Sequence, residues 1–233
     1  FATIVGSNGA GKSTLFNAIT GGFIADEGSI LLGGQDITFA PEHQRSKVIG
    51  HLFQDPLKGT APNMTIEENL ALAYLRAGTA PNAIFSRISR KDKALFREKL
   101  ALLDMGLEDR MKQPVGLLSG GQRQALALVI ANMTDIDLLI LDEHTAALDP
   151  KTAAKVLELS DKFIAEEGLT AMMVTHNMRD AIAHGNRLIM MNNGKIILDV
   201  SGEEKKKLTV EYLLEAFSKL SGEEFANDRA LLN

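Results

Sequence analysis

The chain of 233 residues contains no cysteine, which excludes disulfide bonds and thiolate zinc sites and is consistent with a reducing compartment. No apolar run approaches the roughly 18 residues that a membrane-spanning helix needs. No charged segment followed by an apolar one marks a secretory signal peptide at the amino terminus. The chain has no excess of positive charge either, and its net charge of −5 argues against nonspecific binding to a polyanion such as DNA, although it leaves room for a local basic patch.

What the chain does contain is typical of a globular protein, since 45% of its residues are hydrophobic and 24% are charged. Its length fits one large domain, or a core with a sizeable subdomain. The sequence starts without methionine, inside an apolar stretch over residues 1–5 that predicts a strand. We therefore expect the gene product to begin earlier.

Residues 6–13 have the sequence Gly-Ser-Asn-Gly-Ala-Gly-Lys-Ser, a complete G-x-x-x-x-G-K-S phosphate loop. It follows the predicted strand and precedes a predicted helix at residues 14–20, the context that the motif requires. The glycines let the backbone turn its N–H groups toward an anion at the positive end of the helix. Lys12 would reach the β- and γ-phosphates, and the Ser13 hydroxyl would bind Mg²⁺. The alternative is a glycine-rich turn before an ordinary helix.

Short, continuous apolar runs recur along the chain, as they should in strands that are covered on both faces. We predict buried parallel strands at residues 138–141, Ala171–Val174, 187–191 and 195–199. Residues 150–167 predict a helix between the first two, with Asp149 as its N-cap. This succession indicates a right-handed crossover in a doubly wound sheet. The predicted fold class is α/β, a phosphate-loop NTPase core with a mostly parallel sheet.

The middle of the chain shows no strand pattern over residues 64–116. Helices are predicted at residues 65–75 and 90–105, joined by a turn-rich stretch at residues 77–84. An all-helical subdomain, residues 54–123, is therefore predicted to be inserted into the α/β core.

That core comprises residues 1–53 and 124–233, and its tail contains one predicted helix at residues 210–220. Two basic clusters, residues 87–93 and 205–207, are interpreted as solvated surface. For the first cluster a nucleic-acid contact is the weaker alternative.

Asp142 and Glu143 directly follow the buried strand predicted at residues 138–141. The carboxyl end of such a strand is where ligands bind in open α/β sheets. Asp142 there could hold Mg²⁺ opposite Ser13, and Glu143 could orient or deprotonate a water in line with the γ-phosphate. A helix N-cap carboxylate is the alternative, which the phosphate loop upstream makes less favoured.

Residues 118–122, Leu-Ser-Gly-Gly-Gln, run straight into a predicted helix at residues 123–132. A serine and two glycine amides at a helix N-terminus form an anion receptor. Because the chain already has one phosphate loop, a second receptor suggests a site shared by two chains. A flexible Ser-Gly-Gly hinge is the alternative that the residues leave open.

With these motifs the chain resembles the ATP-binding subunit of ABC transporters. Residues 118–122 match the family's signature motif letter for letter, residues 6–13 match Walker A, and residues 138–142 match Walker B. The other matches are the catalytic glutamate Glu143, the Q-loop Gln54, the D-loop at residues 147–149 and the switch histidine His176. All occur in the family's order, and together they cover nearly the whole chain.

The resemblance implies that two copies sandwich two ATP molecules head to tail. Gln54 would contact Mg²⁺ or the attacking water and report nucleotide occupancy to a membrane partner, and His176 would bind the γ-phosphate and position the water. The implied metal ligands are Ser13, Gln54 and Asp142. The implied nucleotide contacts are Ser7, Asn8, Gly9, Ala10, Gly11, Lys12, Ser13 and Thr14 of one chain, Ser119, Gly120, Gly121 and Gln122 of the other, and Asp149.

Three departures from the family pattern are visible. His144 stands where members usually carry proline; it could titrate near neutral pH, but we favour a tolerated loop substitution. The family's adenine-stacking aromatic lies upstream of the phosphate loop, in a segment that the chain as given lacks, so we expect weaker nucleotide binding and a less stable core. Gln124 stands where a basic or hydrophobic residue is more common, and we expect little effect. The four histidines other than His176 are interpreted as cap or surface residues.

The favoured function is the ATPase of a bacterial membrane importer at the cytoplasmic face of the membrane. Its expected partners are a second copy, integral permease subunits and, indirectly, an extracytoplasmic solute-binding protein, with no nucleic acid. The alternatives are a soluble ABC-type ATPase acting on DNA or ribosomes and a non-hydrolysing module, against which Glu143 and His176 argue. Residues 61–65 and 142–145 resemble an importer branch linked to amino acids such as tryptophan or tyrosine, but selectivity would lie in other subunits.

Overall fold

The computed structural model describes residues 1–76, 88–133 and 135–221. Within them a six-stranded sheet has the order β4-β5-β6-β1-β7-β8, and neighbouring strands are parallel except for the antiparallel pair of β7 and β8. The strands are β1 (Ala2–Gly6), β4 (Ile49–Leu52), β5 (Leu138–Asp142), β6 (Ala171–Val174), β7 (Arg187–Asn192) and β8 (Lys195–Ser201). The mostly parallel α/β fold predicted from the sequence is confirmed.

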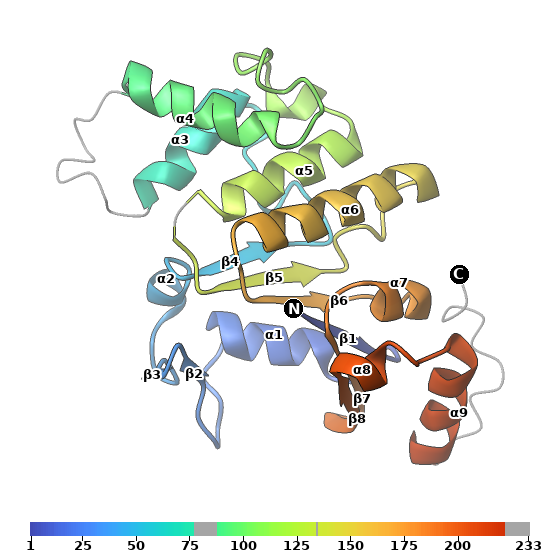
Figure 1. The fold of residues 1–233 in the computed structure, drawn as a ribbon. Coiled ribbons are helices and arrows are strands. Elements are labelled where there is room, and N and C mark those ends of the chain that lie inside the picture. The colour runs from blue at the N-terminus through green and yellow to red at the C-terminus, as the bar shows by residue number, and fades with distance from the viewer. Residues whose placement is uncertain (77–87, 134, 222–233) are drawn as a thin grey trace.

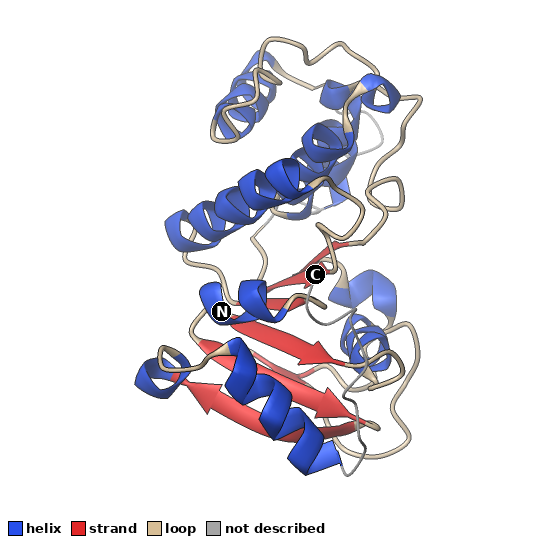
Figure 2. Ribbon diagram, turned by 90° about the vertical axis from the view of Figure 1, so that its right-hand side faces the viewer, coloured by secondary structure: helices blue, strands red, loops and turns tan. Residues whose placement is uncertain are grey.

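Helices cover both faces of this sheet (Figures 1 and 2). Successive strand residues point to opposite faces, so Ile4 of β1 packs with Phe16 of α1 (Lys12–Thr20), whereas Val5 packs with α7 (Met178–Ala183) and α9 (Val210–Ser221). On β5, Ile140 joins the α1 side, while Leu139 and Leu141 face the other helices. The continuous apolar strands of the sequence are thus buried from both sides.

A further layer of helices lies beyond α5 (Gly120–Ala131) and α6 (Pro150–Glu166) in Figure 1. It consists of α3 (Ile66–Arg76) and α4 (Arg90–Ala101), and the short 3-10 helix η1 (Val115–Leu117) leads into α5. One buried cluster runs from Leu70 and Phe96 in this layer through Leu126 of α5 to Leu139 of the sheet. This buried core is continuous across both parts of the chain. The division into a helical subdomain of residues 54–123 and an α/β core of residues 1–53 and 124–233 therefore stays a prediction.

The sequence missed one strand of the sheet and misassigned another. β4 was not predicted, because Gly50 and His51 interrupt its apolar run. β8 was predicted to be buried and parallel, but it is an antiparallel edge strand whose Ile196 is exposed. Asn193 and Gly194, both with positive φ, form the two-residue turn that joins it to β7, a hairpin signal present in the sequence.

Smaller elements were also missed, and several helix ends were shifted. The unpredicted elements are the hairpin of β2 (Leu31–Leu32) and β3 (Gln35–Asp36), the short helices α2 (Glu42–Arg45) and α8 (Gly202–Lys205), and α7. The helix predicted from residue 14 begins at Lys12, that predicted from 123 begins at Gly120, and that predicted to 105 ends at Ala101. The turn-rich stretch predicted at residues 77–84 lies outside the described residues.

The interpretation of residues 205–207 as solvated surface is wrong for Lys205, which is 2% exposed. Its Nζ donates hydrogen bonds to the backbone carbonyls of His184 and Gly185. Burial lowers the pKa of Lys205 to about 8, since desolvation disfavours the charged ammonium.

Candidate active site

Four neighbouring strands of the sheet end in predicted site residues. β1 leads into the phosphate loop, β5 ends at Asp142, and β6 and β4 are followed within two residues by His176 and Gln54. The register aligns these ends, because Asp142 pairs with Val174 and Ile4 pairs with Val174. Parallel strands therefore bring segments that lie up to 170 residues apart (176 − 6 = 170) to one edge of the sheet.

The phosphate loop has the backbone that its glycines predict. Gly9 and Gly11 adopt φ of 80° and 99°, values that residues with a Cβ rarely adopt. Gly11 is the N-cap of α1 without any side-chain cap, which leaves the first N–H groups of the helix free for an anion. The side chains of Asn8, Ser13 and Thr14 lie exposed around this loop.

The Lys12 side chain is buried within the phosphate loop. Its Nζ donates to the carbonyl oxygens of Gly6 at 2.7 Å and Ser7 at 3.0 Å, and the residue is 5% exposed. Burial lowers the pKa of Lys12, although Glu143 and Asp142 oppose that change. A buried ammonium held only by carbonyl dipoles and nearby carboxylates is well placed to meet a more strongly charged anion.

The β7–β8 turn also contacts the phosphate loop, which the sequence did not predict. The N–H of Gly194 donates to the carbonyl of Ala10 at 3.0 Å. The Cα of Gly194 lies 3.2 Å from where a Cβ would stand on Gly11. The Asn193-Gly194 pair was the available signal, because it marks a tight hairpin after a strand beside β1.

Asp142 lies within the electrostatic reach of several of these groups. Burial and the neighbouring Glu143 raise its pKa, while Lys12, His176 and Lys58 act in the opposite direction. The carboxylate is thus partly desolvated and close to the Lys12 ammonium. Such an arrangement favours a further positive charge beside Asp142. Lys58 is a contributor that the sequence did not single out.

Glu143 and His176 contact each other directly. Oε1 of Glu143 lies 2.6 Å from Nε2 of His176, and the two residues line a hollow of about 450 Å³ together with Thr145, Leu148 and Asp180. Glu143 has φ of 47°, a left-handed backbone that costs a residue with a side chain on the order of 1 kcal/mol. Strain of this kind concentrates at functional sites.

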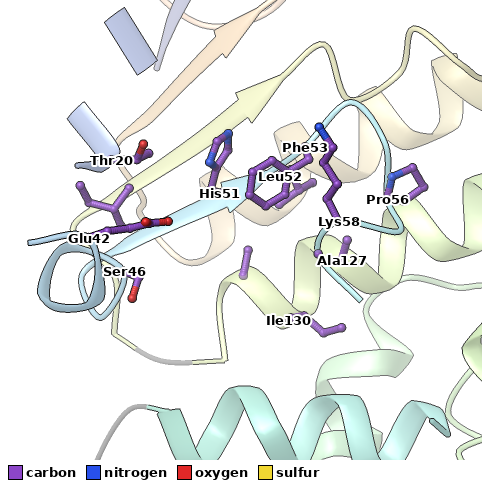
Figure 3. A pocket seen from close by; sticks show the side chains of 13 residues that line it. Thr20, Glu42, Ser46, His51, Leu52, Phe53, Pro56, Lys58, Ala127 and Ile130 are labelled. Atoms are coloured by element: carbon purple, nitrogen blue, oxygen red, sulfur yellow. The ribbon is translucent and has the colours of Figure 1, made fainter. Parts of the chain in front are cut away.

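Gln54 is exposed, two residues after the end of β4. The preceding residue, Phe53, lines a second hollow of about 240 Å³ (Figure 3). The side chains of Leu52, Phe53 and Lys58 line it with Ala127 and Ile130 of α5. His51 stacks on Phe53 with ring centroids 4.0 Å apart, and within the described residues its buried Nε2 has no hydrogen-bond partner. Burial lowers the pKa of His51 to about 4, and the half-buried ring lines this hollow.

Gln124 connects this region to the signature helix α5. It is 1% exposed, and its Nε2 donates to the carbonyl of Phe53 at 3.1 Å. The sequence predicted little consequence at this position, yet the side chain bonds the residue that precedes Gln54.

Residues 119–122 form the N-terminus of α5 rather than a hinge. Ser119 is the N-cap, its Oγ accepts from the N–H of Gln122, and the Gln122 side chain accepts in return from the N–H of Ser119. Gly121 packs so closely on α6 that an added Cβ would stand 2.2 Å from Cγ2 of Thr152. Gly120 lies close to Leu148, since an added Cβ would stand 3.2 Å from its Cδ2. Among the described residues, no hydrogen bond joins residues 119–122 to the phosphate loop of the same chain.

Asp149 caps α6 as predicted, and its Oδ1 accepts from the N–H of Thr152 at 3.1 Å. These hydrogen bonds lower the pKa of Asp149. Its predicted nucleotide contact stays a prediction.

His144 is buried, at 2% exposure, and is not the cap or surface residue that was predicted. Its Nε2 lies 3.2 Å from Oγ of Ser160 in α6. Burial lowers the pKa of His144 to about 4. The alternative that it titrates near neutral pH is therefore wrong. His184 is also engaged, since its Nδ1 lies 2.5 Å from Oδ2 of Asp161.

Comparison with known proteins identifies the family. A model of the ABC transporter family matches residues 1–146. The chain belongs to the ABC transporter family. It is an ATP-binding subunit of the ABC type, and the family's ATP-hydrolysing chemistry makes it an ATPase.

Curated ABC relatives align over most of the chain. It is 44% identical over 217 residues to a tyrosine transport ATP-binding protein of Clostridioides difficile, covering 93% of this chain and 85% of the relative. It is 35% identical to a thiamine import ATP-binding protein of Histophilus somni, with 82% and 83% covered. A methionine import ATP-binding protein of Streptococcus thermophilus is 36% identical, with 90% and 59% covered.

Solved ABC structures share the fold. One is the dimeric post-hydrolysis state of an ATP-binding cassette bound to ADP and Pi, which is 26% identical with a TM-score of 0.72 and covers 86% of this chain and 84% of its own. Another, the ADP conformation of a transporter cassette, is 30% identical with a TM-score of 0.73 and covers 93% and 86%. In this ABC subunit, no helix among the described residues is both long and apolar enough to span a membrane.

Proposed function

We propose that this ABC subunit hydrolyses ATP between two head-to-tail copies and thereby drives solute import through a membrane permease. The observation that carries the proposal is the convergence of the phosphate loop, Asp142, Glu143 and His176 at one sheet edge, with the Glu143–His176 contact of 2.6 Å. The relatives named as transport or import proteins support the direction of transport.

ATP fits the phosphate loop because free helix N–H groups, a buried ammonium and two left-handed glycines surround it. On binding, Lys12 would exchange the carbonyls of Gly6 and Ser7 for the stronger acceptors of a triphosphate. The remaining contacts would come from Ser7 to Thr14 along the loop and the first turn of α1.

Mg²⁺ fits the donor set at the same edge. The ion prefers oxygen ligands and is commonly held by one or two carboxylates with substrate phosphates and waters. Ser13, Asp142 and Gln54 offer a hydroxyl, a carboxylate and an amide oxygen. Burial and the neighbouring Glu143 raise the pKa of Asp142 even though Lys12, His176 and Lys58 oppose that change, so a bound cation would stabilise its carboxylate. When bound, the ion would neutralise charge on the phosphates.

Glu143 would orient the attacking water and take its proton. His176, whose Nε2 contacts this carboxylate, would turn its N–H to the γ-phosphate once ATP is bound. The left-handed backbone at Glu143 would fix the direction of the carboxylate before ATP arrives. Catalysis would thus depend on positioning by this pair.

The second copy would supply Ser119, Gly120, Gly121 and Gln122 to the phosphates held by the first. Support comes from the N–H groups of Gly120 and Gly121 at the start of α5, which the bonds between Ser119 and Gln122 leave unused, and from the dimeric solved relative. Among the described residues, no hydrogen bond joins the signature segment to the phosphate loop of its own chain. Asp149, next to the same interface segment, would contribute through the D-loop.

A permease would dock beside Gln54. The hollow of Figure 3 adjoins a second one that shares Lys58, Gly59 and Ile130 with it and extends to Leu72 of α3. Leu57 and Leu72 are large apolar side chains exposed at 43% and 52%, which is typical of an interaction surface. The subunit would then lie at the cytoplasmic face of a bacterial membrane, with a solute-binding protein reached only through the permease.

An aromatic amino acid is the proposed solute, because the tyrosine transport relative is 44% identical. Uptake of labelled tyrosine and tryptophan by cells carrying the intact operon tests this, with wild type compared with Glu143→Gln. We expect the variant to abolish saturable uptake of one of them. Unchanged uptake of both amino acids in the variant would refute the proposed solute. Purified wild-type protein without ATPase activity would refute the proposed function itself. The nucleic-acid alternative is not favoured by these relatives.

A further inference from the structure

Glu143 is held in its unusual backbone conformation from both sides. Its N–H donates to the carbonyl of Val174 in β6 at 3.1 Å, and its own carbonyl accepts from the N–H of Ala146 at 3.0 Å. The turn that begins at Glu143 contains one more backbone bond, from the N–H of Leu148 to the carbonyl of Thr145 at 3.1 Å. The side chain that follows Glu143 in this turn is that of His144.

His144 is buried against α6 rather than against solvent. The Oγ of Ser160 donates its single hydrogen to the carbonyl of Val156 at 2.9 Å. Its lone pairs therefore accept from His144, so the Nε2 of His144 carries the proton and donates at 3.2 Å. The residue is 2% exposed and Ser160 is 1% exposed, which makes this a directed bond in a closed environment.

We propose that His144 is a positioning residue, which ties the turn after β5 to α6 through Ser160 and so holds Glu143 with its carboxylate directed at His176. The inference rests on the proposed function, since it assigns Glu143 the catalytic role. It assigns a function to His144, which stands where members of the family usually carry proline. Among the described residues, no hydrogen bond or ion pair joins His144 to His176 or to the phosphate loop.

His184, which follows α7, supplies a matched control because it bonds the same helix, α6. It is a second histidine bonded to α6, through Asp161, the residue next to Ser160. Within the part of the chain that the structure describes, no hydrogen bond or ion pair links His184 to Glu143. If His144 only stabilised the fold, replacing His144 and replacing His184 should therefore change kcat to a similar extent.

The test compares kcat and KM for ATP of the full chain in six forms: wild type, His144→Ala, His144→Gln, Ser160→Ala, His184→Asn and Glu143→Gln. Each is assayed well below its own unfolding temperature. The amide Nε2 of glutamine can donate from nearly the place of the imidazole Nε2. The His144→Gln variant should therefore rescue turnover without restoring an imidazole.

We expect His144→Ala to lower kcat about 10-fold with KM for ATP nearly unchanged, because a misdirected carboxylate slows the step without weakening binding. His144→Gln should recover most of that loss, Ser160→Ala should lower kcat in the same direction, and His184→Asn should keep the wild-type kcat even if it unfolds at a lower temperature.

Wild-type kcat in His144→Ala, no rescue by His144→Gln, or an equal loss in His184→Asn would overturn the positioning role. If Glu143→Gln itself turns over ATP at the wild-type rate, the proposed function is what fails. An inactive Glu143→Gln together with a fully active His144→Ala refutes the positioning role alone.

Discussion

The Nε2 atom of His176 lies 2.6 Å from Oε1 of Glu143, although 33 positions separate the two residues in the chain (176 − 143 = 33). They follow adjacent parallel strands, β6 and β5, whose register pairs Val174 with Asp142. The sheet therefore positions the pair before any nucleotide binds. A contact formed in advance in this way reduces the reorganisation that the reaction requires.

This pair should behave as one unit in catalysis. We expect Glu143→Gln and His176→Ala each to lower kcat by about 10²-fold or more, because each removes part of the device that positions the water and accepts its proton. The double variant should lose little beyond the larger single loss. ATP binding, measured by titration with a fluorescent analogue, should persist in both single variants. Losses that multiply in the double variant would contradict joint action.

Lys12 should be required for binding ATP but not for folding. Lys12→Met removes a buried ammonium whose pKa is lowered by desolvation, so the nucleotide-free variant should unfold no earlier than the wild type. ATP affinity should fall at least 10-fold, because a charge-assisted contact to the phosphates is lost. Calorimetric titration and thermal unfolding measure the two effects. Unchanged affinity would contradict the phosphate-loop assignment.

Gly194 should support nucleotide binding from the neighbouring hairpin. Gly194→Ala places a side chain at φ of 75°, which costs on the order of 1 kcal/mol and disturbs the bond from Gly194 to Ala10. We expect a lower unfolding temperature and a several-fold weaker affinity for ATP. The control is Gly33→Ala in the β2–β3 hairpin, where φ is 56° and no atom crowds the site. A similar loss of affinity in both variants would show that the effect is not local to the loop.

The stability of the protein should decrease in mild acid because of buried histidines. Burial lowers the pKa of His51 and of His144 to about 4, so the folded chain keeps both neutral while the unfolded chain binds protons below about pH 6.5. The free energy of unfolding should therefore fall as the pH drops from about 6.5 toward 4. For His144, the difference between 6.5 and about 4 corresponds to roughly 3 kcal/mol.

Urea unfolding of the wild type and of His144→Gln across this pH range measures that contribution. The variant should show a shallower loss of stability, because glutamine keeps the hydrogen bond and does not titrate. Identical pH dependence in the two proteins would mean that His144 is accessible to protons in the folded state.

The sequence predicted the chemical groups of the site better than the contacts that position them. Apolar runs that end in Asp142 or lead into Gly6 identify strands and place polar residues at their ends, which is enough to expect the site at one sheet edge. The capping role of Asp149 also follows from a local pattern.

What the sequence missed depends on contacts between distant segments. Lys205 lies in a run of lysines, but only the fold shows that it bonds the end of α7. His144 and Gln124 looked like tolerated substitutions, and their partners, Ser160 and Phe53, lie 16 and 71 positions away. β8 was taken for a buried strand because apolar content alone does not distinguish an edge from the centre of a sheet.

The central claim is that each ATP site combines the phosphate loop of one copy with Ser119 of the other. Two mixed dimers separate this arrangement from a site built within one chain. One pairs a Lys12→Met copy with a Ser119→Ala copy; the other pairs a wild-type copy with a copy carrying both substitutions. Differently tagged copies purified together provide each of them.

ATP hydrolysis by these two mixed dimers tests the account most directly. We predict that the dimer with the substitutions on separate copies stays active, because one complete site survives, and that the dimer with both substitutions on one copy is nearly inactive. The reverse order of activities, or full hydrolysis by a strict monomer, would contradict the shared site.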